Sequence, residues 1–113
     1  MYTVRVSRRF SAAHFIKGKA GRCENVHGHN YRVEVAVSSF DLSRQGMVAD
    51  FIDIRTHLDE VLPDHVMLND VFEFTPTAEH LARHFFDEMS KQFPVSSVRV
   101  WENEESSAEY QPD

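Results

Sequence analysis

The sequence contains one cysteine, four glycines and four prolines among its 113 residues. A single cysteine, Cys23, cannot form an internal disulfide, and so few glycines and prolines leave little room for linkers or low-complexity segments. No run of about eighteen apolar residues occurs, which argues against a membrane-spanning helix. The segment after Met1 lacks the apolar core of a secretory signal, so we expect a cytoplasmic protein.

Positive charge is also scarce. The chain has 12 Lys and Arg residues against 18 Asp and Glu residues, a formal net charge of −6 with its seven histidines neutral. This balance argues against a broad surface for nucleic acid. The hydrophobic content of 42%, which includes nine Phe residues, is enough to bury one core. We therefore expect one folded domain that spans residues 1–113.

Two segments alternate with the period of two that is typical of strands with one buried face. The first begins at Tyr2, and its inward positions continue through Phe10 and Ala12 to His14. The inward positions of the second are His27, His29, Tyr31, Val33, Val35 and Val37. Because residues i and i+2 of a strand point the same way, the imidazoles of His27 and His29 are predicted to be neighbours.

Two helices follow. Apolar residues recur at helical spacing from Phe51 to Leu62, with Ile54, Leu58 and Val61 between them, and Pro63 ends this pattern. The second helix is expected to begin at residues 75–77, with a threonine as N-cap and Pro76 near the first helical position. Its predicted core stripe is Ala78, Leu81, Phe85 and Met89.

Alternation returns from Val98 to Glu102, which predicts a closing strand with Glu102 on its inner face, before a polar tail. A short further strand is expected near residues 47–50. Strands followed by helices and a closing strand predict an α+β fold. Such a small antiparallel sheet has open hydrogen-bonding edges, and association with other subunits would close them.

His27-Gly28-His29 is a pair of the kind that binds zinc, and His14 is the candidate for a third ligand. Three histidines without a fourth protein ligand indicate a catalytic site with open coordination positions. The alternative is that these are ordinary core or surface histidines. Several inward imidazoles without a metal would leave buried nitrogens competing for partners, so we favour zinc.

Cys23 lies four residues before His27 in a polar stretch that is typical of a loop. It is a candidate nucleophile, base or fourth metal ligand, and the alternative is a small buried hydrophobic residue. Asp64-His65 follows the first predicted helix, where an Asp can orient a histidine for proton transfer. Structural or solvent-facing roles are expected for the remaining histidines, His57, His80 and His84.

Glu102 is an acidic residue among inward-pointing valines and needs a partner. A carboxylate suits a ligand with two adjacent N–H donors, as the edge of a pterin or guanine ring provides. The alternative is an ion pair with Arg5 or Arg99.

Six short motifs stand together in this chain. They are Phe10-Ser-Ala-Ala-His14, Cys23-Glu-Asn-Val-His27-Gly-His29-Asn-Tyr31, Gly46-Met-Val-Ala-Asp50-Phe51, Asp64-His65 with Leu68-Asn69-Asp70, Pro76-Thr77-Ala-Glu79 and Trp101-Glu102. The combination resembles the 6-pyruvoyltetrahydropterin synthase family almost from end to end. The three residues between Cys23 and His27 match the branch that forms 6-carboxytetrahydropterin in queuosine biosynthesis.

The resemblance implies the tunnelling fold (T-fold), with antiparallel strands flanked on one face by two helices. In that fold three subunits join their sheets into a barrel and two trimers stack, so a homohexamer with active sites between subunits is expected. The implied substrate is 7,8-dihydroneopterin triphosphate, converted to 6-carboxy-5,6,7,8-tetrahydropterin, acetaldehyde and triphosphate.

The resemblance also implies the roles of individual residues. The expected zinc ligands are His14, His27 and His29, and the expected catalytic residues are Cys23, Asp64, His65 and Glu102. Cys23 would accept a proton, His65 with Asp64 would complete the relay, and Glu102 would hold the pterin edge or join the relay. Thr77 is expected to touch the pterin.

Lys17, Lys19 and Arg22 form a short basic cluster in an otherwise acidic chain. As a hypothesis, this loop is a gate for the triphosphate, with Lys17 and Lys19 as substrate-binding residues. The alternative is an ordinary solvated surface.

Other functions remain open. They are the 6-pyruvoyltetrahydropterin synthase reaction, which eliminates triphosphate without cleaving the side chain, and a zinc-binding or pterin-binding module without catalysis. A generic zinc hydrolase would leave Cys23 and Glu102 unexplained.

Overall fold

The computed structural model describes residues 1–18 and 24–113. The strands are β1 (Tyr2–His14), β2 (His27–Ser39), β3 (Val66–Met67), β4 (Val95–Trp101) and β5 (Ser107–Tyr110). The helices are α1 (Phe51–Val61), α2 (Leu68–Val71) and α3 (Ala78–Met89). The expected α+β fold is therefore present.

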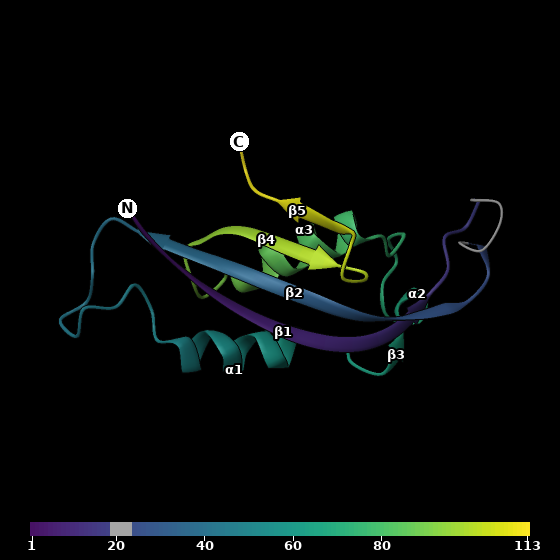
Figure 1. Ribbon diagram of the computed structural model, residues 1–113, viewed down its shortest axis with the longest axis horizontal. Helices are drawn as coiled ribbons and strands as arrows, with labels where there is room; N and C mark the ends of the chain where they lie inside the picture. The colour runs from purple at the N-terminus through teal and green to yellow at the C-terminus, as the bar shows by residue number, and fades with distance from the viewer. Residues whose placement is uncertain (19–23) are drawn as a thin grey trace.

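One five-stranded sheet, in the order β3-β1-β2-β4-β5, organises the chain. β1 and β2 form a long antiparallel ribbon whose register runs from Tyr2 opposite Ser39 to His14 opposite His27. This ribbon extends beyond β4 and curves at the end where the histidines lie (Figure 1). β3 pairs with β1 in parallel, a contact that the sequence pattern did not predict.

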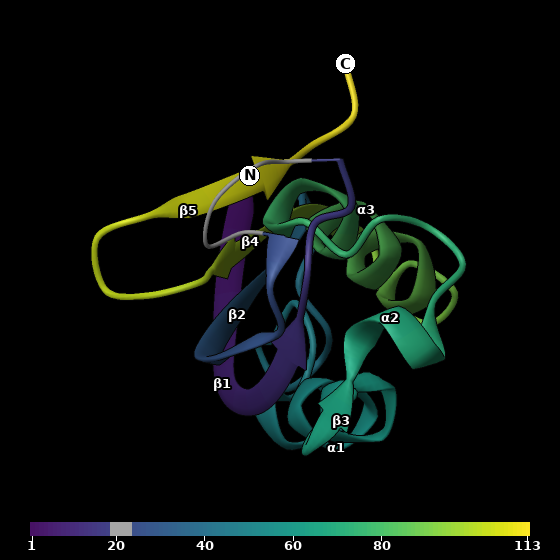
Figure 2. The same cartoon turned by 90° about the vertical axis from the view of Figure 1, so that its right-hand side faces the viewer.

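The helices α1 and α3 cover one side of the curved sheet (Figure 2). Alternation in β2 explains the core, because Tyr31, Val33, Val35 and Val37 are all 0% exposed. The residues of α3 that pack against them form the predicted stripe of Ala78, Leu81, Phe85 and Met89. In α1 the buried positions are Ile54 and Leu58. Phe51 was expected to share that stripe, but as the first helical residue it is 51% exposed.

The two helices begin at side-chain caps. Asp50 accepts a hydrogen bond from the Ile52 N–H at 2.8 Å, and the Thr77 hydroxyl accepts one from the His80 N–H at 3.2 Å. Pro76 therefore lies one residue before the N-cap, and the prediction of Pro76 near the first helical position was wrong. The reason is that Thr77, rather than Thr75, supplies the capping hydroxyl.

Two predictions about strands were also wrong. Residues 47–50 do not form a strand; Ser43 and Met47 close a turn around Gly46, whose φ is 82°. Glu102 lies just past β4, where its N–H donates to the Ser106 carbonyl and closes the turn to β5. The polar tail, for which no strand was predicted, returns as β5, with Ala108 and Tyr110 packed against the core.

Within the described part of the chain, no helix combines the length and the apolar character that a membrane crossing requires.

Candidate metal centre and the cavities around it

Three imidazoles meet at the curved end of the β1–β2 ribbon. His14 and His27 stand opposite each other on the two strands, and His29 follows two residues later on the same side of β2. The three rings lie 4.6 to 5.0 Å apart between centroids, and one nitrogen from each falls within 4.8 Å of the others. This is the arrangement that strand parity predicted.

Backbone carbonyls determine which nitrogen of each ring carries the proton. His14 Nδ1 lies 2.8 Å from the Pro76 carbonyl oxygen, and His27 Nδ1 lies 2.7 Å from the Asn25 carbonyl oxygen. A carbonyl can only accept, so both Nδ1 atoms carry a hydrogen and donate it. The Nε2 atoms of both rings therefore present lone pairs to the centre of the cluster, 3.0 Å apart.

The donor set fits a bound cation. Two facing lone pairs repel each other unless a cation lies between them, and buried His29 Nε2 has no hydrogen-bond partner among the described residues. A proton can bridge only two of these nitrogens, whereas a metal ion satisfies all three. Nitrogen ligands of tetrahedral zinc stand about 3.3 Å apart. The 3.0 Å separation is close to that value.

Burial of His29 also favours a bound cation. It is the largest cause that lowers the pKa of His29, and the neighbouring His14 and His27 lower it further, against an opposing effect of Glu102. A lowered pKa keeps the imidazole neutral, which is the form that binds metal.

Tyr31 and Pro76 contact His14 at Nδ1 and were not predicted to take part in the site. The Tyr31 hydroxyl lies 3.1 Å from His14 Nδ1, and its own pKa is raised, first by burial and then by the charge of Glu102. His14 is itself 1% exposed. These contacts hold the ring with Nε2 inward, which is the usual role of groups behind a metal ligand.

Glu102 faces the cluster from the turn after β4. Its Oε1 lies 3.7 Å from His14 Nε2, and its side chain is 32% exposed. The ion pairs considered for it do not form, because Arg5 pairs with Glu34 and Arg99 pairs with Glu109. Glu102 therefore keeps a carboxylate oxygen available for a ligand.

The Asp64-His65 pair lies beside the other wall of the ribbon. Asp64 accepts a hydrogen bond from the Ser11 N–H at 2.8 Å and contacts His65 Nδ1 at 2.9 Å. The Ser11 bond is the largest cause of the lowered pKa of Asp64, so this carboxylate stays ionised. His65 has a left-handed backbone (φ 58°) and an imidazole that is 81% exposed.

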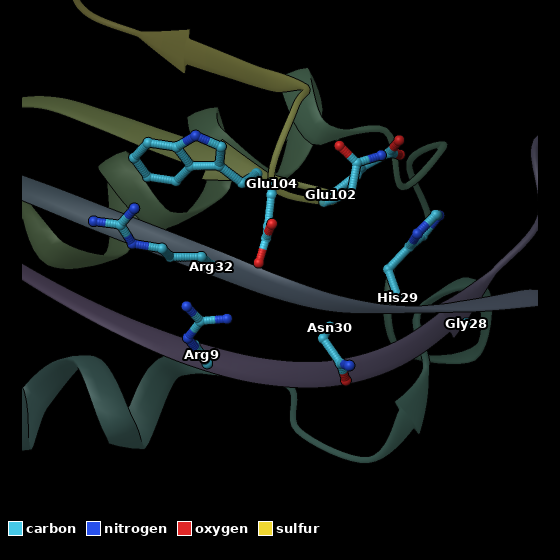
Figure 3. Close-up of a pocket in the computed structure, with 9 residues that line it drawn as sticks. Arg9, Gly28, His29, Asn30, Arg32, Glu102 and Glu104 are labelled. Carbon is cyan, nitrogen blue, oxygen red and sulfur yellow. The ribbon is translucent and has the colours of Figure 1, made fainter.

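Three cavities converge on His29 and Glu102. A cavity of about 510 Å³ joins His29 with His65, and one of about 220 Å³ joins Glu102 with Thr77. The third, of about 420 Å³, contains both His29 and Glu102 and extends along β2 (Figure 3). Thr77, Glu102, His29 and His65 therefore line cavities that share His29 or Glu102, and His14 and His27 contact His29.

The other predicted residues that the structure describes do not line these cavities. Lys17 is exposed in a turn after β1, and Lys19, Arg22 and Cys23 fall outside the described residues. The histidines expected to have structural or solvent-facing roles do not belong to the cluster. Exposed His80 donates from Nδ1 to the Thr75 carbonyl at 2.6 Å, His84 packs on Phe72, and His57 contacts Glu60.

Comparisons with known proteins agree on one family. The family model described as 6-pyruvoyl tetrahydropterin synthase matches residues 3–113. An Archaeoglobus fulgidus protein, provisionally named 6-carboxy-5,6,7,8-tetrahydropterin synthase, is 43% identical over 107 residues, which cover 92% of this chain and 90% of that protein. The 6-carboxy-5,6,7,8-tetrahydropterin synthase of Haemophilus influenzae is 30% identical and covers 98% of this chain and 99% of its own.

A solved structure shows the same fold. The 6-pyruvoyl tetrahydropterin synthase of Caenorhabditis elegans superimposes with a TM-score of 0.87 at 24% identity, over 99% of this chain and 96% of that one.

Proposed function

Because this chain belongs to the 6-pyruvoyl tetrahydropterin synthase family, we propose that it converts 7,8-dihydroneopterin triphosphate and water to 6-carboxy-5,6,7,8-tetrahydropterin, acetaldehyde and triphosphate. Queuosine biosynthesis is the proposed pathway, and the cytoplasm the proposed compartment. The observation that carries the proposal is the convergence of three histidine nitrogens, two with hydrogen-bonded Nδ1 atoms and one without a partner, beside a free carboxylate.

The proposed metal is zinc, held by Nε2 of His14, His27 and His29. Bound there, zinc would polarise the side-chain hydroxyls of the substrate and so ease removal of the adjacent protons. The buried ring of His14, held by Pro76, limits how far this centre can shift during the reaction.

The residues around the centre are assigned to substrate binding and proton transfer. We assign Glu102 and Thr77, which line one cavity, to the N–H edge of the pterin ring. Cys23, as a thiolate, would take the proton from the side chain. His65, oriented by Asp64, would carry protons to and from the reacting side chain, and its exposed imidazole can exchange them with solvent.

Association completes the proposed enzyme. In the described part of the chain, β5 has one unpaired edge, and β3 covers only Ala12 and Ala13 of the outer edge of β1. Long open edges favour pairing with another chain. We propose a homohexamer, a dimer of trimers, in which the active sites lie between subunits.

The deciding experiment is incubation of the purified zinc-loaded protein with 7,8-dihydroneopterin triphosphate, followed by identification of the pterin and any aldehyde. We expect 6-carboxy-5,6,7,8-tetrahydropterin and acetaldehyde in equal amounts. A 6-pyruvoyl product without acetaldehyde would identify the alternative synthase reaction. Binding of zinc or pterin without turnover would identify a non-catalytic module.

The basic loop supplies a separate prediction. Lys17 and Lys19 are proposed to attract the triphosphate as it enters, since the rest of the chain is acidic. Replacing both with alanine is expected to raise KM for the triphosphate substrate about fivefold at low salt. Kd for dephosphorylated dihydroneopterin, which lacks the leaving group and serves as the binding control, should stay unchanged. An equal rise in Kd for this compound would refute the assignment.

A further inference from the structure

The face of the sheet opposite the helices carries two arginines that the proposed chemistry has not used. Arg9 on β1 stands opposite Arg32 on β2, and Arg32 stands opposite Trp101 on β4. All three side chains line the 420 Å³ cavity that contains His29 and Glu102 (Figure 3). A row of residues across three strands thus forms one wall of a cavity that reaches the metal centre.

Neighbouring arginines form ion pairs with acidic residues, whereas Arg9 forms none with the residues that the structure describes. Arg8 makes two hydrogen bonds to Asp59 of α1, at 2.9 and 2.7 Å. Arg99 pairs with Glu109 at 3.7 Å. Arg9 forms no ion pair with any described residue, so its positive charge is available to a ligand.

Arg32 is held in place without full neutralisation. Its guanidinium lies 4.3 Å from the centre of the Trp101 ring, and its one ion pair, with Glu34, is long at 3.7 Å. Stacking on an indole orients the planar guanidinium while leaving its N–H groups free to donate. Arg32 is therefore a preorganised donor rather than a freely moving surface charge.

A shared cavity connects this wall to the metal centre. Arg32 follows His29 by three residues on β2, so the two side chains leave opposite faces of the strand. Both still line one cavity, at the end of β2 where the pairing with β4 begins only at Arg32. Thr77 lines the neighbouring 220 Å³ cavity, and Glu102 lines both cavities, so the pterin end and the phosphate end of one elongated ligand each have a place.

We propose that Arg9 and Arg32 form the binding site for the substrate triphosphate, in the cavity that leads away from the metal centre. Guanidinium groups bind phosphate oxygens with paired, charge-assisted hydrogen bonds. The identification of the ligand as a triphosphate rests on the proposed function, whereas the existence of a polyphosphate site does not.

The acidic groups that line the same cavity are Glu102 and Glu104. Glu102 is assigned to the pterin, and Glu104 lies in the turn between β4 and β5, with its side chain directed over the cavity (Figure 3). A carboxylate in this place repels an incoming phosphate. Removing the charge of Glu104 is thus expected to strengthen binding of an anion.

The test is titration of the intact zinc-loaded protein with inorganic tripolyphosphate, followed by calorimetry. Arg9→Gln and Arg32→Gln are each expected to weaken binding about tenfold, and Glu104→Gln to tighten it about threefold. Arg99→Gln is the matched control, because it removes the same charge from the same face outside the cavity, and binding should not change. Thermal unfolding verifies that each variant is folded.

Each outcome separates this proposal from the proposed function. Weakened tripolyphosphate binding in the Arg9 and Arg32 variants, with no turnover of the pterin triphosphate by the parent protein, would retain the anion site and reject the enzyme reaction. The parent could instead turn over the substrate while tripolyphosphate binding is absent or unaffected by both arginine substitutions. That outcome would reject the proposed phosphate site and retain the proposed reaction. An equal loss in Arg99→Gln would reduce the effect to general surface charge and also overturn it.

Discussion

Replacing His29 with alanine is expected to abolish tight zinc binding and to lower turnover of the proposed substrate by about a thousandfold or more. His29 supplies one of three nitrogens that converge on a single point, and two imidazoles alone hold zinc weakly. Because His29 Nε2 has no hydrogen-bond partner within the described chain, its removal leaves no new unpaired group. The metal-free variant should therefore unfold within about 1 kcal/mol of the metal-free parent.

Two measurements check this result. Elemental analysis after dialysis should find zinc in the parent and little in the variant. Added zinc should raise Tm of the parent and leave that of the variant unchanged. His80→Ala is the control, because His80 is exposed and stands outside the cluster. If the His29 variant retained zinc with the affinity of the parent, the three-histidine site would be rejected.

Replacing Cys23 with alanine is expected to lower turnover about a thousandfold while zinc content stays at the level of the parent. The expectation follows from the proposed role of Cys23 as proton acceptor, since loss of a general base costs 10²- to 10⁴-fold. Cys23 is the only cysteine of the chain, so alkylation of the thiol should inactivate the parent in the same way and should have no effect on the variant.

The same variant separates the three roles considered for Cys23. A fourth metal ligand would lose zinc affinity together with turnover, and a structural cysteine would lose stability with turnover largely retained. Cys23→Ser distinguishes a proton acceptor from a packing residue, because a hydroxyl fills similar space but does not ionise near neutral pH. Full activity in Cys23→Ser would contradict the proposed role.

Much of the core follows from local patterns alone. Tyr31, Val33, Val35 and Val37 are buried because alternation in a strand puts them on one face, whatever the partner. The same parity placed His27 beside His29 and directed His14 inward. A threonine N-cap could be predicted for a similar reason, since a threonine hydroxyl satisfies N–H groups of its own helix, but the structure identified it as Thr77 rather than Thr75.

Contacts between distant segments could not be obtained in this way. The Pro76 carbonyl that holds His14 is 62 residues away along the chain, and nothing in the local sequence marks it as a partner of a histidine. β5 escaped prediction because only Ala108 and Tyr110 of a short polar segment carry its alternation. Glu102 was assigned to a strand because parity continues past Trp101, whereas the turn to β5, closed by the backbone bond from Glu102 to Ser106, begins at this residue.

Residue order by itself therefore determined which side chains share a face, including three histidines suited to one cation, because strand parity depends only on position along the chain. The tertiary structure decided which nitrogen of His14 faces the cluster, through the Pro76 carbonyl brought from a distant segment. It also decided that Arg9 and Arg32 share a cavity with His29, since strand pairing and the curvature of the sheet bring them there.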